Sequence, residues 1–221
     1  MNLVGIRELV SFSAVVTTIL QFLSGILVCK QYVVNRTTAE SSPLPFICGF
    51  LSCGVWLLYG LIKQDNIVTF VNVVGILLMI SYVFVFYNYT FKKTSLSKQF
   101  LVSLVFYMFI MGYVSVETDN ELLLRRVGLS ACILTMLAIA APMSKLLYVI
   151  RTKCTECLPF PMIVMSFIVS SLWFFYGLIE EDVYMMIPNS IGCGLTAVQL
   201  CLFMIYPATP YSSLPTKTTL A

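Results

Sequence analysis

The chain has 221 residues, of which 59% are hydrophobic and 10% are charged, and its formal net charge is +3. A water-soluble domain carries about 25% charged residues, so the composition excludes one. The small net charge gives no indication of a nucleic-acid partner. The mean hydropathy of +0.94 instead indicates a protein embedded in a lipid bilayer.

An apolar stretch of about 20 residues can cross a bilayer as an α-helix. In chain order, the sequence predicts seven such spans, near 6–29, 44–62, 66–89, 99–116, 127–150, 159–179 and 183–206. The first span has neither a basic start nor a small-residue cleavage site, so we expect a retained helix rather than a signal peptide. The spans leave only short loops and a polar tail from Pro207, with no room for a soluble catalytic domain.

The second and third spans carry a pattern that returns 117 residues later in the chain. The first copy consists of Trp56, Tyr59, Gly60, Asp65, Asn72 and Gly75, and the second of Trp173, Tyr176, Gly177, Asp182, Asn189 and Gly192. A shorter motif, Leu44-Pro45-Phe46, returns as Leu158-Pro159-Phe160 with an offset of 114. An internal repeat within apolar helices is typical of transporters whose two halves surround a shared pathway.

The repeat predicts an all-α integral membrane protein with seven transmembrane helices in a 3+1+3 arrangement. Two directly joined three-helix copies would cross the membrane in opposite directions, and one extra helix near 99–116 restores a parallel orientation. We therefore expect a first three-helix repeat (6–89), a connector helix with its loops (90–126), a second three-helix repeat (127–206) and a tail (207–221). The axis relating the two repeats should run along the membrane normal.

The charged residues are distributed unevenly between the two ends of the predicted helices. Nine of the 13 basic residues fall at one end, namely Lys30, Arg36, Lys92, Lys93, Lys98, Lys145, Arg151, Lys153 and Lys217. Eight of the 10 acidic residues fall at the other end, namely Glu8, Asp65, Glu117, Asp119, Glu121, Glu180, Glu181 and Asp182. Because Lys and Arg are in excess on the cytoplasmic side of membrane proteins, we expect an extracellular or luminal amino terminus and a cytosolic tail.

Two asparagines and two tryptophans are the candidate binding residues within the spans. Asn72 and Asn189 are repeat equivalents, and each would place an amide in hydrocarbon unless it faced a polar cavity or joined two helices. Trp56 and Trp173 are the only tryptophans. They could anchor the helices at the membrane interface. They could also flank the apolar face of a sugar ring, whose hydroxyls would bind the amides.

Prolines lie near the predicted cytosolic ends of several helices. Pro45, Pro142 and Pro159 are the candidates for hinges, because a proline removes one helical hydrogen bond and clashes with the preceding turn. Prolines are also common in membrane helices without a special role. The first repeat has Gly25 at the position equivalent to Pro142.

The sequence lacks groups that catalysis, metal binding or proton coupling would need. It contains no histidine, and no Asp or Glu lies deep within a predicted span, whereas proton-coupled carriers generally keep such groups in the membrane. The single Cys154-x-x-Cys157 motif has no second pair, and a zinc site normally needs four ligands, so we interpret it as reduced thiols in a loop. We expect no enzyme, no cofactor and no metal site, and the passive movement of a neutral polar solute.

At these residues the chain resembles the SWEET family of sugar transporters, most closely its animal form, from about residue 6 to 206. The resemblance rests on Leu44-Pro45-Phe46, Trp56-x-x-Tyr59-Gly60, Asn72-x-x-Gly75, Ala141-Pro142, Leu158-Pro159-Phe160, Trp173-x-x-Tyr176-Gly177 and Ile187-Pro188-Asn189-x-x-Gly192. It implies a uniporter that carries glucose or a similar hexose in both directions by alternating access. Parallel repeats are known in this family.

The resemblance also implies roles for single residues. It implies a central sugar pocket lined by Trp56, Trp173, Asn72 and Asn189, a cytosolic gate hinged by Pro45, Pro142 and Pro159, and an outer gate closed by a hydrogen bond between Tyr59 and Asp182. The chain departs from the family at the fourth hinge position, where it has Gly25, although glycine also relaxes a helix. Trp56 is bulkier than the equivalent residue of many plant members, which favours a monosaccharide.

Other functions remain open at the level of sequence. A PQ-loop carrier of amino acids would have a Pro-Gln dipeptide, and phenylalanine follows both Pro45 and Pro159. A seven-helix sorting receptor for luminal peptides would need basic residues within its cavity, and the spans offer none. A scaffold for other membrane proteins is a third alternative. The family resemblance implies the plasma membrane, the Golgi membrane or both, and a homo-oligomer by analogy only.

Overall fold

The computed structural model describes residues 3–39, 41–140 and 143–207. Every regular element in these ranges is an α-helix. In chain order the helices are α1 (Leu3–Asn35), α2 (Leu44–Lys63), α3 (Asn66–Tyr89), α4 (Lys93–Val116), α5 (Asn120–Ala140), α6 (Met143–Thr152), α7 (Phe160–Ile179) and α8 (Val183–Ile205). All except α6 are long and apolar enough to cross a membrane, which confirms the prediction of seven spans.

The boundaries of the fifth predicted span are wrong. We expected one helix over 127–150, but α5 begins at Asn120, seven residues earlier, and ends at Ala140, and the ten-residue α6 follows from Met143. The expected connector segment, 90–126, therefore includes the first two turns of α5. Asp119 explains the early start, because its carboxylate accepts hydrogen bonds from the backbone N–H groups of Glu121 and Leu122 and so caps the first turn. Pro142 lies outside the described residues.

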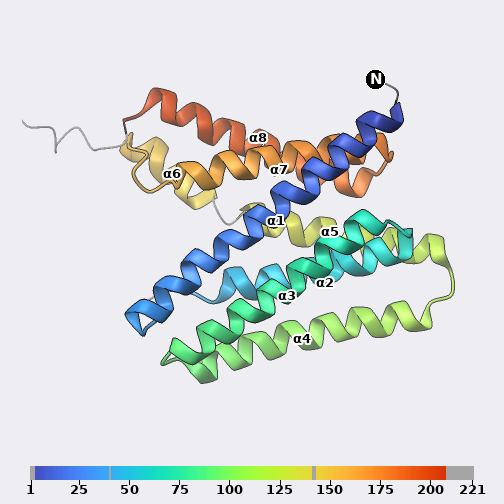
Figure 1. The fold of residues 1–221 in the computed structure, drawn as a ribbon, viewed down its shortest axis with the longest axis horizontal. Helices are drawn as coiled ribbons and strands as arrows, with labels where there is room; N and C mark the ends of the chain where they lie inside the picture. Colours follow the sequence, from blue (N-terminus) through green and yellow to red (C-terminus); the bar gives the residue numbers. More distant parts are fainter. Residues whose placement is uncertain (1–2, 40, 141–142, 208–221) are drawn as a thin grey trace, which may run out of the picture.

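The helices are connected so that three turns lie at one end of the bundle. The α2–α3, α4–α5 and α7–α8 connections gather at the right in Figure 1, and the starts of α2, α4 and α7 lie at the left. We call the end with these three connections the aspartate end, because it holds Asp65 and Asp182. We call the opposite end, where α2, α4 and α7 begin, the proline end, because it holds Pro45 and Pro159.

The two groups of three helices make equivalent contacts. α2 packs along α3, and α7 packs along α8 in the same way. The leading helix of each group contacts the third helix of its own group and the second helix of the other, so that α1 packs on α3 and α7, and α5 packs on α8 and α2. Figure 1 shows α1 crossing between the two groups, with α4 at the outside. In the described chain, α4 packs mainly against α2.

Buried side chains form one shared core at the aspartate end and two separate cores at the proline end. The shared core joins α2, α3, α4, α5, α7 and α8 around Val55, Tyr59, Ala131, Tyr176 and Met185. At the proline end, a cluster that includes Tyr32, Ile47 and Phe86 belongs to the first group and α4. Another that includes Val149, Leu158 and Leu202 belongs to the second group and α6. The two halves are therefore packed together near the aspartates and apart near the prolines.

The outer face of the bundle is strongly apolar. On α4, Val102 is 70% exposed and Phe109 is 73% exposed, and Leu137 on α5 is 65% exposed. A soluble protein rarely exposes apolar side chains over such an extent. Hydrocarbon tails of a bilayer can cover this surface, because a 20-residue helix at about 1.5 Å per residue spans about 30 Å, the thickness of the bilayer core.

Candidate functional site

Two reciprocal hydrogen bonds join the repeats at the aspartate end. The hydroxyl of Tyr59 on α2 donates to Oδ2 of Asp182 at 2.7 Å. Its repeat equivalent, Tyr176 on α7, donates to Oδ2 of Asp65 at 3.0 Å. Each tyrosine reaches the aspartate of the other half, so the two bonds close this end symmetrically. We refer to these four residues as the gate.

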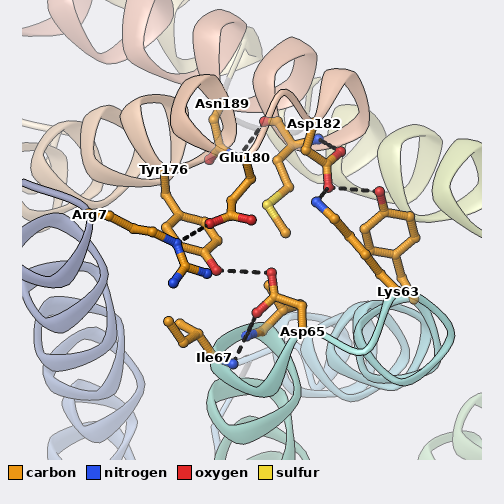
Figure 2. Close-up of polar contacts among 11 residues, drawn as sticks. Arg7, Lys63, Asp65, Ile67, Tyr176, Glu180, Asp182 and Asn189 are labelled. Carbon is orange, nitrogen blue, oxygen red and sulfur yellow. Dashed lines mark hydrogen bonds and ion pairs between the residues drawn. The ribbon is translucent and has the colours of Figure 1, made fainter. Parts of the chain in front are cut away.

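The same aspartates determine where the third helix of each repeat begins. Oδ1 of Asp65 accepts from the backbone N–H groups of Ile67 and Val68, and Oδ1 of Asp182 accepts from Met185. Such N-caps contribute about 1 kcal/mol each to helix stability. One carboxylate oxygen thus orients the aspartate on its own helix, while the other is left for the tyrosine of the opposite half, as Figure 2 shows for Asp65 and Tyr176.

The glycine after each gate tyrosine allows a tight turn. The backbone N–H of Asp65 donates to the carbonyl of Gly60, and that of Asp182 donates to Gly177, each at 2.8 Å. A Cβ at Gly60 would lie 2.8 Å from Oγ1 of Thr69, and one at Gly177 would lie 3.1 Å from Cβ of Met185. The Tyr-Gly motif therefore lets two helices approach closely enough to place the aspartate.

Two ion pairs complete the gate, and they are not equivalent. Lys63 at the end of α2 pairs with Asp182, whose side chain is 1% exposed. The position equivalent to Lys63 in the second repeat is Glu180, which pairs instead with Arg7 of α1 at a more exposed site. Figure 2 shows the two pairs on either side of the aspartate end. Asp182 therefore carries three partners, whereas Asp65 has no basic partner among the described residues.

The two tryptophans also join the repeats in a reciprocal way. The indole Nε1 of Trp56 donates to Oγ1 of Thr135 on α5 at 3.0 Å, and Nε1 of Trp173 donates to Oγ1 of Thr18 on α1 at 2.8 Å. Thr18 and Thr135 are themselves 117 residues apart. Each tryptophan also packs edge-on against the gate tyrosine of its own helix, with ring centroids 5.5 Å apart in both copies.

The two asparagines are turned toward their own helices. Nδ2 of Asn72 donates to the carbonyl of Val68, and Nδ2 of Asn189 donates to that of Met185, both at 2.8 Å. Neither bond joins two helices, so the helix-joining role considered from the sequence is absent from the described contacts. Each amide oxygen has no hydrogen-bond partner among the described residues and retains the capacity to accept from a ligand hydroxyl.

A cavity of about 500 Å³ lies on the proline-end side of these residues, between α1, α5, α7 and α8. Its lining extends from Thr135, which holds Trp56, to Leu158 and Pro159 at the start of α7. This volume is within the range of small-molecule sites. Trp56, Trp173, Asn72 and Asn189 do not form its wall, so the structure brings Pro159 to the cavity but none of the four predicted pocket residues.

The four predicted hinge positions differ from one another. Gly25 lies within the unbroken helix α1, against the ring of Tyr82. Pro45 is the second residue of α2, whereas Pro159 is the N-cap of α7. They therefore occupy different helical positions, in keeping with the change of offset from 114 to 117. Pro142 lies outside the described residues.

The sequence-based prediction missed several residues of the site. It identified Tyr59 with Asp182 but not the reciprocal pair Tyr176 with Asp65, although the 117-residue offset would have given it. The same offset relates Thr18 to Thr135. Apart from Thr135, the polar cavity residues could not be found in this way, and neither could Lys63, because their repeat equivalents are residues of a different kind.

Comparisons with known proteins agree with this architecture. A family model described as "Sugar efflux transporter for intercellular exchange" matches residues 8–94 and 125–210. A "Sugar transporter SWEET1" of Drosophila pseudoobscura pseudoobscura is 41% identical over 207 residues, which cover 93% of this chain and 92% of that protein. A "Bidirectional sugar transporter SWEET1" of Arabidopsis thaliana is 30% identical over 197 residues, which cover 86% of this chain and 79% of that protein.

A solved structure supports the fold directly. The structure of a eukaryotic SWEET transporter superposes with a TM-score of 0.81 and covers 90% of this chain and 97% of the solved one. The two sequences are 23% identical over that match. The described residues include seven helices long and apolar enough to cross a membrane, and this structural match confirms the predicted all-helical fold class.

Proposed function

Because the chain belongs to the SWEET family of sugar transporters, we propose that it carries glucose or a similar hexose across a membrane as a bidirectional uniporter. The observation that carries this proposal is the difference between the two ends of the bundle. One shared core and two reciprocal tyrosine–aspartate bonds join the halves at the aspartate end. Separate cores and a cavity of about 500 Å³ occupy the proline end.

Alternating access requires that the closed end can open at a small cost. Each hydrogen bond to a gate carboxylate contributes about 1.5–3 kcal/mol. This is a net value, because water binds the same oxygens and hydroxyls when the gate opens and offsets most of the strength of the direct bond. The two reciprocal bonds together contribute a few kcal/mol, which is the range that separates two populated conformations. A bond network that water can replace suits a gate better than a dry apolar contact.

The chemistry of the cavity favours a neutral, hydroxyl-rich solute. Its polar lining comes from amides and hydroxyls, and no described lining residue is charged. An amino-acid carrier or a receptor for a peptide carboxylate would need a charged partner for its ligand, so both alternatives are disfavoured. The volume of about 500 Å³ accommodates a hexose. The bulk of Trp56 favours a monosaccharide over a disaccharide.

In the proposed cycle, the sugar binds between the tryptophans and asparagines before it reaches the cavity. Trp56 and Trp173 would contact the apolar faces of the ring, and Asn72 and Asn189 would accept hydrogen bonds from its hydroxyls through their unpaired amide oxygens. The gate residues Tyr59 and Asp182, with their repeat equivalents, would close the outer side. Gly25, Pro45, Pro142 and Pro159 would act as hinges of the opposite side.

The orientation and the membrane of the chain follow from its charges and its family. The distribution of basic residues supports a cytosolic proline end and an extracellular or luminal aspartate end, with a multi-pass protein in the plasma membrane, the Golgi membrane or both. The equivalent packing of α1–α3 and of α5, α7 and α8 supports two repeats joined by the α4 connector. A homo-oligomer is proposed by family analogy alone.

The test is uptake of radiolabelled hexose into proteoliposomes. The wild-type chain should carry glucose, and Trp173→Ala and Asn189→Ala should each abolish most of the uptake at equal reconstitution. A matched control is Ser190→Ala, which changes the exposed neighbour of Asn189 whose hydroxyl bonds its own helix. Absence of uptake by the wild-type chain would show that the proposed hexose transport is wrong. Near-normal uptake by both variants would show that Trp173 and Asn189 serve packing and not sugar binding.

A further inference from the structure

Among the described residues, all but one of those that line the proline-end cavity belong to the second repeat. These residues come from α5, from Leu158 and Pro159 just before α7, and from α7 and α8, and the exception is Gln21 of α1. Adding 117 to a residue number of the first repeat gives the equivalent position of the second repeat. This offset holds along α3 and α8, and it holds along α2 and α7 because neither helix is interrupted. The two repeats can therefore be compared position by position.

In the first repeat, large side chains fill the equivalent space. The ring of Tyr82 lies so close to Gly25 that a Cβ there would be 2.5 Å from Cε2 of the ring. The sulfur of Met79 covers Gly49 in the same way, at 2.8 Å from the position of a Cβ. Tyr82 is 4% exposed and its hydroxyl donates to the carbonyl of Phe22 at 3.0 Å, so the filling is both apolar and hydrogen-bonded.

In the second repeat, smaller or polar side chains take these places. Gln199 is equivalent to Tyr82, Thr196 to Met79, Ser170 to Cys53 and Ser166 to Gly49. Gln199, Thr196, Ser170 and Ser166 all line the cavity. The amide of Gln199 and the hydroxyl of Thr196 therefore leave an open, hydrogen-bonding space, whereas Tyr82 and Met79 occupy the equivalent positions of the first repeat.

Gln199 gives the strongest indication of a ligand. Its side chain is 4% exposed, lines the cavity, and makes no hydrogen bond to any residue that the structure describes. A buried amide normally has a hydrogen-bond partner, which here a ligand or water in the cavity can supply. A primary amide offers two donors and an acceptor, which suits a ligand that carries several hydroxyl groups.

Further hydrogen-bonding groups surround the same space. Nε2 of Gln21 donates to Oγ of Ser166 at 3.0 Å, which leaves the amide oxygen of Gln21 and the hydroxyl hydrogen of Ser166 for other partners. The hydroxyl of Ser170 lies next to Gly192, where a Cβ would be 2.9 Å from its Oγ. The glycine keeps this part of the cavity open.

We propose that this cavity is a second sugar-binding site, at which Gln199, Gln21, Ser166 and Ser170 bind hydroxyl groups of the hexose as it enters or leaves at the proline end. The proposal rests on sugar transport as the function of the chain. It makes the pathway asymmetric at this end. The sugar passes along the second repeat, while Tyr82 and Met79 exclude it from the first.

The first experiment measures hexose uptake by Gln199→Leu in proteoliposomes over a range of sugar concentrations. The loss of one hydrogen bond between neutral groups should raise the half-saturation concentration about three- to tenfold, with little change in the maximal rate. The matched control is Gln31→Leu, the same change at an exposed position of α1, which should leave both values unchanged. Ser166→Ala provides a second variant of nearly unchanged volume, with a smaller effect in the same direction.

The second experiment separates a sugar contact from a structural effect. Singly deoxygenated glucose analogues are compared in the wild-type chain and in Gln199→Leu. Removal of the sugar hydroxyl that contacts Gln199 should lower the apparent affinity of the wild-type chain. The same removal should not lower the apparent affinity of Gln199→Leu, because the variant has already lost this hydrogen bond. A merely structural role would leave every analogue penalised equally in both proteins.

The outcomes distinguish this proposal from the proposed function. If the wild-type chain carries no hexose, sugar transport itself is wrong. If the wild-type chain carries hexose, and Gln199→Leu and Ser166→Ala keep its half-saturation concentration and its pattern of analogue penalties, the second site is wrong while transport stands.

Discussion

The hydroxyl of Tyr59 donates a 2.7 Å hydrogen bond to the carboxylate of Asp182, 123 positions further along the chain. Asp182 is 4% exposed, caps α8 and also pairs with Lys63. This single carboxylate thus fixes the start of one helix and holds the end of another from the opposite repeat. Its equivalent, Asp65, caps α3 and accepts a hydrogen bond from Tyr176, but it has no lysine partner among the described residues.

Removal of one gate hydroxyl should loosen the aspartate end. Tyr59→Phe loses a bond to a carboxylate, worth about 1.5–3 kcal/mol, which should shift the closed–open equilibrium about tenfold or more. Amide hydrogen exchange at residues 60–68 and 177–186 should become faster, and hexose uptake should fall. Tyr184→Phe is the control, since Tyr184 packs against Tyr59 and its hydroxyl makes no hydrogen bond to the described residues. Equal exchange in both variants would contradict the role of the gate bond.

The two ion pairs of the gate should differ in their contribution to stability. Lys63→Met leaves the carboxylate of Asp182, 1% exposed, without its cation, and loss of one partner of a buried pair costs about 3–5 kcal/mol. Because Lys63 itself is 21% exposed, we expect about 2–3 kcal/mol. Arg7→Met breaks a pair in which the arginine is 49% exposed, and should cost about 1 kcal/mol or less.

Thermal unfolding of the two purified variants in detergent checks this difference. The unfolding temperature should fall clearly for Lys63→Met and barely for Arg7→Met. The reverse order, or equal shifts, would show that Asp182 does not depend on Lys63.

Gly25 should resist substitution although glycine weakens a helix. An alanine within a helix is favoured over glycine by about 1 kcal/mol, but its Cβ at this position would lie 2.5 Å from the buried ring of Tyr82. Overpacking of this kind costs about 1–3 kcal/mol, so Gly25→Ala should lower the unfolding temperature. Gly112→Ala is the control, because a Cβ there has no neighbour within 4 Å. Tyr82→Leu should relieve the defect of Gly25→Ala. If it does not, the ring is not the obstacle.

The repeat pattern predicts much of this site because symmetry places equivalent residues in equivalent contacts. The offset of 117 relates both gate pairs, both capping aspartates and both tryptophan–threonine bonds. The same rule fails for Lys63 and Glu180, and for Tyr82 and Gln199, where the two copies differ in chemistry. Such positions depend on packing against particular neighbours, which a pattern within one sequence does not reveal.

Hydropathy predicts the number of spans well and their ends less well. The start of α5 at Asn120 includes Glu121, Arg125 and Arg126, residues that an apolar window excludes. Asp119 caps this turn, and Arg126 donates to the hydroxyl of Tyr113 on α4 at 2.9 Å. These polar contacts extend the helix beyond the apolar segment.

Glycosylation tests the proposed orientation. Asn35-Arg36-Thr37 and Asn88-Tyr89-Thr90 both match the acceptor motif, and both lie at the proline end. If that end is cytosolic, neither asparagine should be modified in a eukaryotic cell. Glycosidase treatment should leave the mobility of the chain unchanged. A mobility shift that is lost in Asn35→Gln or Asn88→Gln would reverse the orientation.

The proposed uniporter equilibrates sugar and does not concentrate it. The sequence has no histidine, and the acidic side chains nearest the gate, Asp65, Glu180 and Asp182, are engaged in hydrogen bonds or ion pairs. No described group within the cavity can bind a coupling proton. Steady-state hexose accumulation in sealed proteoliposomes under an imposed inward proton gradient is the most direct measurement. A uniporter should give an internal concentration equal to the external one. Accumulation several-fold above it, abolished by an uncoupler, would contradict the uniport mechanism.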